Sequence, residues 1–182
     1  MIKNKLLWLR IKINVCEKIF HRDVMELKLE RYRMEGAEIG KNVRAFSPIS
    51  SSEPYLLSVG NNLTISTGVK FCTHDNSAVK IFNDGTDFVG SIRIGDHSFI
   101  GMNAIIMGGV KLPEHCIVGA GSIVTKSFLE EGCVIAGNPA RIIGNIKEIR
   151  DRNRNKVFNF RGMSQMEKKK EILSHSEKYI QK

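Results

Sequence analysis

The stretch IGDHSFIGMNAIIMGGVKLPEHCIVGAGSIV, residues 94–124, places a branched aliphatic residue at every sixth position. Glycine follows at once in three of these hexads, at Gly95, Gly101 and Gly119. A strand repeats its side chains every two residues and a helix every 3.6, so a strict period of six fits neither element alone. It fits a short strand and a turn, wound repeatedly with one aliphatic side chain pointing inward on each side. These ladder residues are Ile94, Ile100, Ile106, Leu112, Val118 and Val124.

A shorter run upstream has the same spacing at Val59, Ile65 and Phe71, with Ile39 and Ala45 as a degenerate start. A second line of small or apolar residues lies four positions after the ladder residues, and we expect both lines to fill a narrow interior. Each hexad buries its face only by stacking on the neighbouring coil. The residues of the second line are Leu63, Val69, Ser98, Ala104, Val110, Cys116, Ser122 and Phe128.

Glycine and asparagine at the corners of the coil, at Gly60, Gly95 and Gly101 and at Asn61-Asn62, suit backbone with positive φ. We therefore predict an all-β-dominated chain built as a parallel β-helix of hexapeptide repeats, with helices at both ends.

The predicted segments are an N-terminal helical segment at 1–35, the coil at 36–144 with a loop at 72–93, and a basic helical extension at 145–182. Apolar residues in the first segment recur at helical spacing and predict a helix packed on its own protein or on a sister subunit. The alternative is a membrane-surface helix, favoured by Trp8 and the basic residues around it. The apolar residues are Leu6, Leu7, Ile11, Val15, Ile19 and Phe20, and the basic ones are Lys3, Lys5, Arg10 and Lys12.

The segment 72–93 breaks the hexad register. Phe71 and Ile94 are 23 positions apart, whereas one coil of three hexads takes 18, so about five residues are surplus. A polar loop carrying Phe82 and Phe88 must bulge from the coil here, and loops on a rigid framework are common functional sites.

The composition restricts the class of protein. The chain has 182 residues, 42% hydrophobic content and a formal net charge of +9, with much of the excess at its two ends. No nucleic-acid-binding motif is present, so phosphate-bearing small molecules or a membrane surface are the expected partners. The four cysteines have no metal-binding spacing, and with no signal peptide we expect reduced thiols in a cytoplasmic protein.

Three motifs carry a family resemblance: Gly119-Ala-Gly-Ser-Ile-Val-Thr-Lys126, Ala136-Gly-Asn-Pro-Ala-Arg141, and Thr73-His74-Asp75 at the start of the loop. Together they resemble the acyl-CoA-binding end of the hexapeptide-repeat acyltransferases. The most similar branch acetylates sugars and bacterial surface polysaccharides and includes galactoside and maltose acetyltransferases. The resemblance covers roughly residues 55–146.

The resemblance implies a left-handed β-helix in a homotrimer, with acetyl-CoA as donor in clefts between subunits. It assigns His74 as the base that deprotonates the acceptor hydroxyl, a role that suits an imidazole near neutral pH. Asp75 is a candidate to orient that imidazole. Adjacent strand residues point to opposite faces, so Asp75 is equally a candidate to bind the acceptor or a sister subunit. Asn76, Asp84 and Asp87 are candidate acceptor-binding residues.

For the donor, the resemblance places Met102 and Ala120 at coil edges along the pantetheine arm. Thr125 and Lys126 match a pair that reaches the nucleotide end. Arg141 matches a basic residue near the nucleotide phosphates, for which a guanidinium is well formed.

His97 and His115 are 18 positions apart, so one lies directly above the other after a full coil. With His74 they raise the idea of a zinc site, as in carbonic anhydrases of this fold, but the closely spaced histidine pair of those enzymes is missing here. Stacked strands lie about 4.8 Å apart, which makes the two histidines simple neighbours. No metal is expected.

We therefore predict an acetyl-CoA-dependent O-acetyltransferase acting on a sugar hydroxyl in bacterial surface polysaccharide (O-antigen or capsule) biosynthesis. Alternatives are another small acceptor, such as an amino sugar, serine or an antibiotic, and a non-catalytic or metal-dependent β-helix protein. The basic ends would suit a lipid-linked acceptor, with the protein peripheral at the inner membrane surface.

Overall fold

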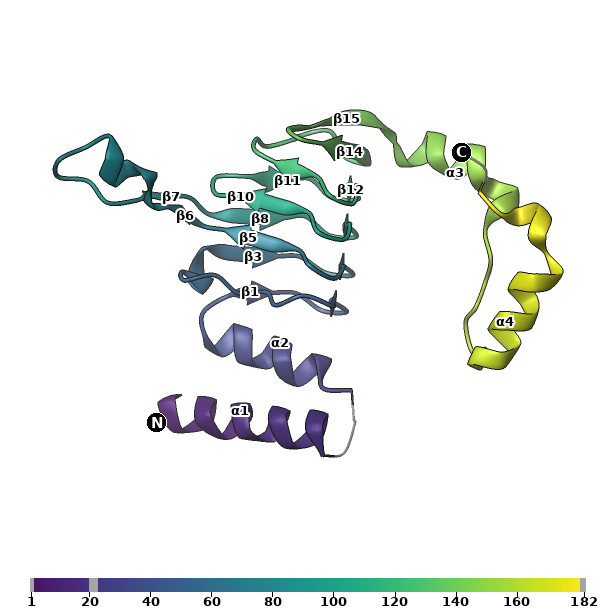
Figure 1. Cartoon of the computed structure of the whole chain (residues 1–182), viewed down its shortest axis with the longest axis horizontal. Coiled ribbons are helices and arrows are strands. Elements are labelled where there is room, and N and C mark those ends of the chain that lie inside the picture. The colour runs from purple at the N-terminus through teal and green to yellow at the C-terminus, as the bar shows by residue number, and fades with distance from the viewer. Residues whose placement is uncertain (1, 20–22, 181–182) are drawn as a thin grey trace. The chain divides into compact units, whose positions relative to one another are not determined.

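The computed structural model describes residues 2–19 and 23–180 and divides into two compact units, Met1–Asn145 and Ile146–Lys182 (Figure 1). Two helices begin the first unit, and a stack of short strands follows them. Over the described ranges, no helix has both the length and the apolar character needed to cross a bilayer.

Helix α1 (Ile2–Lys18) packs against helix α2 (Met25–Met34), which in turn lies on the first strands of the coil (Figure 1). Leu9, Ile13 and Val24 form a small buried cluster between the helices. Two ion pairs join them, from Lys28 Nζ to Glu17 Oε1 at 2.7 Å and from Arg10 Nη2 to Glu35 Oε1 at 2.9 Å. Phe20 of the expected apolar stripe lies outside the described residues.

Most strands run parallel in three sheets, and each sheet contains the strands from the same side of successive coils. The first sheet has the order β1 (Glu38–Ile39), β3 (Leu57–Val59), β8 (Ile92–Ile94) and β11 (Lys111–Leu112). The second has the order β5 (Lys70–Cys72), β10 (Ile105–Met107) and β13 (Ile123–Val124). The third has the order β2 (Arg44–Ala45), β4 (Thr64–Ile65), β9 (Phe99–Ile100), β12 (Ile117–Val118), β14 (Cys133–Gly137) and the antiparallel β15 (Ala140–Asn145).

The hexad ladder lines the interior, as its period predicts. Ile94 pairs with Leu112, Ile100 with Val118, and Ile106 with Val124, so partners lie one coil of 18 residues apart. All residues of the ladder, of the upstream run Val59-Ile65-Phe71 and of the second line are buried. The hydrophobic effect therefore stabilises the stack along its whole length, because each coil covers the apolar face of the next.

The predicted conformation of the corner glycines is wrong. Positive φ falls three positions after the ladder residues, for example at Asn62, His97 and His115, and not at Gly95 or Gly101. Gly95 and Gly101 are required instead because any side chain there would clash with the backbone of the next coil. A Cβ on Gly95 would lie 2.5 Å from a backbone nitrogen of the next coil, and one on Gly101 would lie 2.6 Å from another.

The predicted loop leaves the coil after β5. It contains a short antiparallel pair, β6 (His74–Asp75) with β7 (Phe88–Val89), and a turn of 3₁₀-helix, η2 (Asn76–Lys80), at its start. Figure 1 shows it projecting from the side of the stack, beyond the ends of the coil strands. The aromatic rings of Phe82 and Phe88 meet edge to face, with centroids 6.1 Å apart.

The second unit is helical. It consists of α3 (Ile146–Asn153), η3 (Arg154–Lys156), α4 (Gln165–Ser174) and η4 (Ser176–Lys178). Ser164 and Glu167 form a reciprocal capping box that satisfies backbone N–H groups at the start of α4. The rings of Phe158 and Phe160 stack at 5.3 Å.

All four cysteines are free thiols. Cys116 and Cys133 are buried on adjacent coils, with 3.6 Å between their sulfur atoms. Burial raises the pKa of both thiols, which keeps them protonated and inert. Cys16 and Cys72 are half-buried.

Candidate active site

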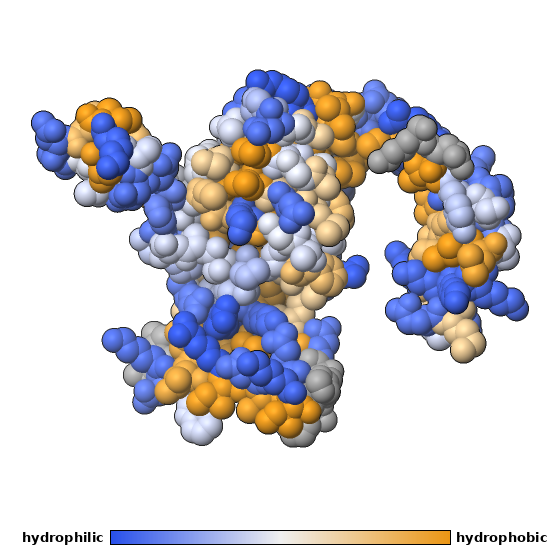
Figure 2. Space-filling view, viewed as in Figure 1, coloured by the Kyte–Doolittle hydropathy of each residue, from blue (hydrophilic) through white to orange (hydrophobic). Residues whose placement is uncertain are grey.

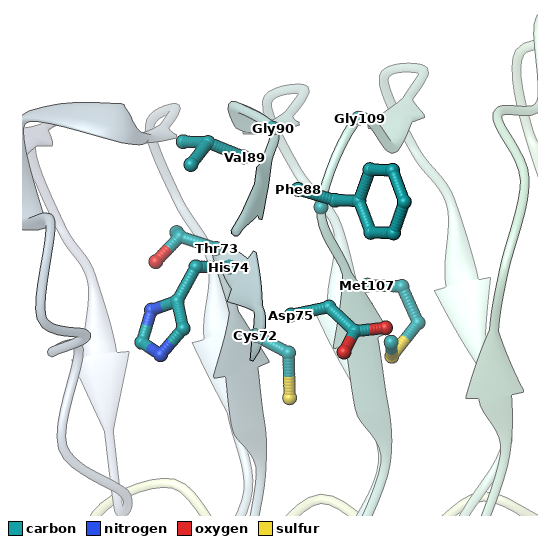
Figure 3. Close-up of a pocket in the computed structure, with 10 residues that line it drawn as sticks. Cys72, Thr73, His74, Asp75, Phe88, Val89, Gly90, Met107 and Gly109 are labelled. Atoms are coloured by element: carbon teal, nitrogen blue, oxygen red, sulfur yellow. The ribbon is translucent and has the colours of Figure 1, made fainter. Parts of the chain in front are cut away.

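A cavity of about 300 Å³ lies where the loop leaves the coil (Figure 3). Strands β5, β6, β7 and β10 and the turn after β10 form its wall. Its lining residues are Cys72, Thr73, His74, Asp75, Phe88, Val89, Gly90, Met107, Gly108 and Gly109. The cavity therefore combines an imidazole and a carboxylate with apolar walls.

The His74 side chain is held by a carboxylate that the sequence did not reveal. Glu53 lies just before η1 (Pro54–Leu56), and its Oε2 is 2.9 Å from Nδ1 of His74. The same oxygen accepts a 2.6 Å hydrogen bond from Oγ1 of the buried Thr73. Thr73 therefore holds the Glu53 carboxylate in place, and this carboxylate in turn holds the imidazole of His74.

The two groups also shift each other's protonation. The hydrogen bond from Thr73, followed by that from His74, lowers the pKa of the Glu53 carboxyl below its usual value. The hydrogen bond to Glu53, reinforced by the negative charge of that carboxylate, raises the pKa of His74 above 6.5. Nδ1 of the neutral ring then carries the proton toward Glu53, and Nε2 keeps its lone pair. Among the described residues Nε2 of His74 has no hydrogen-bond partner.

Asp75 does not orient His74. Its Oδ1 accepts a 2.9 Å hydrogen bond from the backbone N–H of Ser77 and caps the start of η2, and this contact lowers the pKa of Asp75. In Figure 3 the side chains of His74 and Asp75 point to different sides of β6, as alternation along a strand requires. The contact with the imidazole for which Asp75 was one candidate is made by Glu53, and Asp75 keeps a place in the cavity wall.

The other loop candidates, Asn76, Asp84 and Asp87, are not among the residues that line the cavity. Nδ2 of Asn76 donates to the backbone oxygen of Thr86 at 2.9 Å and to Oδ1 of Asp87 at 3.2 Å, which ties the two sides of the loop together. Asp84 is exposed, and within the described loop no contact joins it to Asn76 or Asp87.

The donor-site candidates all lie on the exposed surface of the coil. The backbone oxygen of Met102 accepts a 2.8 Å hydrogen bond from the N–H of Gly121, so Met102 and Ala120 occupy one edge on successive coils. Lys126 holds its ammonium 5.7 Å from the centre of the Phe128 ring, and Thr125 precedes it. Arg141 follows the β14–β15 turn, with Nη1 bonded to the backbone oxygen of Ala140 at 3.0 Å.

His97 and His115 are ladder neighbours, with parallel rings whose centroids are 4.8 Å apart. Their corner is separate from the cavity. Glu114, His115 and Glu131 bring ligand atoms within 4.8 Å of one another there, at the protein surface. His74 belongs to no such group within the described part of the chain, so the structure does not assemble the three-histidine site considered from the sequence.

Glu53 was missed because it is 21 positions before His74 and belongs to no motif. The sequence could have indicated Glu53 through its position, since it lies roughly one coil before His74 and a side chain there is stacked beside the base of the loop.

Comparison with known proteins gives concordant matches. Residues 91–126 match the family model described as the hexapeptide repeat of succinyl-transferase. Protein CapG of Staphylococcus aureus is 37% identical over 136 residues, which cover 71% of this chain and 76% of CapG. Galactoside O-acetyltransferase of Escherichia coli is 31% identical over 121 residues, which cover 66% of this chain and 58% of that enzyme.

Among solved structures, a galactoside acetyltransferase in complex with coenzyme A superposes with a TM-score of 0.55 at 22% identity, covering 90% of this chain and 88% of that one. This likeness supports the shared fold. The extent and identity of the match to CapG, together with the match to galactoside O-acetyltransferase, lead to the conclusion that the chain belongs to the hexapeptide-repeat acetyltransferase family and is an acyltransferase.

Proposed function

We propose that this protein transfers the acetyl group of acetyl-CoA to a hydroxyl of a sugar, as a step in the biosynthesis of a bacterial surface polysaccharide. The observation that carries the proposal is the imidazole of His74, held by Glu53 at the wall of a cavity on a hexapeptide coil. Sugar O-acetyltransferases among the relatives support a sugar hydroxyl as acceptor.

The geometry suits general-base catalysis. A sugar hydroxyl is a poor nucleophile at neutral pH, and a positioned imidazole accepts its proton as the oxygen attacks. Nε2 of His74 takes the proton, and the hydroxyl oxygen bonds to the thioester carbonyl carbon. The carbon–sulfur bond then breaks, and the imidazolium returns a proton to the departing thiolate of coenzyme A. Glu53 stabilises the imidazolium while it exists, because its carboxylate faces Nδ1 at 2.9 Å.

Acetyl-CoA is the donor, as in the galactoside acetyltransferase whose structure contains coenzyme A. We place its pantetheine arm along the edge formed by Met102 and Ala120, where a small side chain allows close approach. Thr125 and Lys126 would meet the nucleotide end, and Arg141 the phosphates. The exposure of all five residues leaves them accessible to such a ligand.

We further infer a homotrimer of left-handed coils with its active sites between subunits. The loop supports this assembly, because it exposes several large apolar side chains that another protein surface would cover. These side chains are Ile81, Phe82, Phe88 and Val89. Four free thiols suit a cytoplasmic location, where acetyl-CoA is available.

The decisive experiment measures release of the coenzyme A thiol from acetyl-CoA with a panel of soluble sugars. Replacing His74 with alanine should lower kcat by about 10²- to 10⁴-fold, while coenzyme A binding by calorimetry and the mass in solution stay unchanged. His97→Ala is the matched control. His97 stacks on His115 and does not line the cavity, so its replacement should leave turnover unchanged. Undiminished turnover in the His74 variant would refute the assignment of the base.

A further inference from the structure

The outward face of α1 is apolar and uncovered. Leu9 and Ile13 point toward α2 and are buried, but a second row of large apolar side chains faces away from it. Trp8 is 70% exposed and Ile19, just beyond the helix, is 66% exposed. At 100° per residue this second row falls within an arc of about 120° on the side opposite the α2 contact, which it shares with Asn4 and Lys18. The second row, called here the outer face, consists of Leu7, Trp8, Ile11, Val15 and Ile19.

A helix that is apolar on both sides is usually buried on both sides. Within the described residues of the first unit, α2 covers one side only, and Figure 2 shows several hydrophobic (orange) residues along the lower edge of this unit, where α1 lies. Ordinary surfaces expose single apolar residues, whereas a contiguous row of this size marks an interaction surface.

The charges beside the outer face identify its partner. Lys5 and Lys12 flank it on one side and Lys3 on the other, while Lys18 lies within it between Leu7 and Ile11. None of these four lysines has an ion pair in the described structure. The one acidic residue between positions 2 and 19 is Glu17, which lies on the α2 side and is already bonded to Lys28. The outer face therefore presents apolar side chains between rows of free positive charge.

We propose that the outer face of α1 docks on a membrane surface that contains anionic lipids. Trp and other large apolar side chains enter the headgroup boundary, and flanking lysines meet the lipid phosphates. A second copy of this chain is the poorer occupant, because pairing two outer faces would bring lysine rows against each other. The site of acetyl transfer takes no part in this docking, so either can fail without the other.

Trp8 makes the test direct, because it is the only tryptophan in the chain. Its fluorescence in the full-length protein should shift to shorter wavelength on titration with vesicles of phosphatidylglycerol and phosphatidylcholine in equal parts. Vesicles of phosphatidylcholine alone should give a much weaker shift. An emission maximum that is already short without vesicles would overturn the proposal, since it would show that protein covers Trp8. No shift with anionic vesicles would overturn it too.

Two double variants distinguish docking by the lysines of α1 from attraction by the net positive charge of the whole protein. Each lysine near an anionic surface contributes about fivefold in partitioning, so Lys5→Gln with Lys12→Gln should weaken vesicle binding about 25-fold. The matched control, Lys169→Gln with Lys170→Gln, removes the same charge from exposed positions of α4 and should change binding less than about twofold. Equal loss in both pairs would indicate attraction by net charge alone and would overturn docking by α1. Turnover of a soluble acceptor should be the same in all variants.

Discussion

Replacing Glu53 with glutamine tests the most specific feature of the site. The change keeps the size and shape of the side chain and removes its negative charge. In the structure, Oε2 of Glu53 lies 2.9 Å from Nδ1 of His74 and accepts a 2.6 Å hydrogen bond from Thr73. The glutamine amide oxygen can accept both of these hydrogen bonds, because the same oxygen of Glu53 accepts them, but without its negative charge the side chain stabilises a protonated imidazole far less.

The size of the effect follows from the setting of the pair. A comparable change in a fully buried carboxylate–histidine pair of a serine protease lowers kcat by about 10⁴-fold. Here the side chains of Glu53 and His74 are 22% and 38% exposed, so water screens their interaction. We therefore expect kcat to fall by about 10²-fold, with little change in the KM for acetyl-CoA.

The pH dependence gives a second readout that a merely structural role would not move. His74 acts as a base only when neutral, and Glu53 raises the pKa of His74. Activity of the natural protein should therefore fall as the pH drops through a value above 6.5. Without the carboxylate the imidazole protonates at lower pH, so the acid limb of the kcat/KM profile should move to lower pH in Glu53→Gln.

Asp75→Asn is the matched control, because it removes a carboxylate of the cavity wall that bonds to Ser77 and not to His74. It should shift the acid limb less than Glu53→Gln does. The reasoning is refuted if Glu53→Gln leaves both kcat and the acid limb unchanged, or if Asp75→Asn moves the limb further.

Three further predictions concern the coil and the donor site. Ile106→Ala should lower the free energy of unfolding by about 2–5 kcal/mol in a urea titration, because Ile106 is fully buried, whereas the exposed Ile143→Ala should stay within about 0.5 kcal/mol. Gly101→Ala should destabilise by about 1–3 kcal/mol, since its Cβ would lie 2.6 Å from a backbone nitrogen of the next coil; an unchanged unfolding midpoint would contradict that contact. Arg141→Gln should raise the KM for acetyl-CoA on the order of tenfold through loss of a charge-assisted bond to phosphate, and the exposed Arg152→Gln should not.

Much of the fold could be read from the sequence, because the interior of the coil accepts few residue types. Ile94, Ile100 and Ile106 recur at six positions since each side of the coil has one strand and one corner, and their burial confirms that reading. The break between Phe71 and Ile94 placed the loop, and His74 at its base lines the cavity. These features depend on local spacing, which a sequence displays directly.

The structure alone determined what depends on stacking between coils. The carboxylate that contacts the imidazole of His74 comes from Glu53, 21 positions upstream, and not from the adjacent Asp75. The register between stacked coils determines this contact. Stacking also decided that Gly95 is needed for space and not for positive φ. Helical spacing predicted the apolar side chains of α1, but only its packing on α2 shows which of them stay exposed to solvent. The period of a sequence specifies which side chains point inward, whereas contacts between distant segments exist only once the coils are stacked.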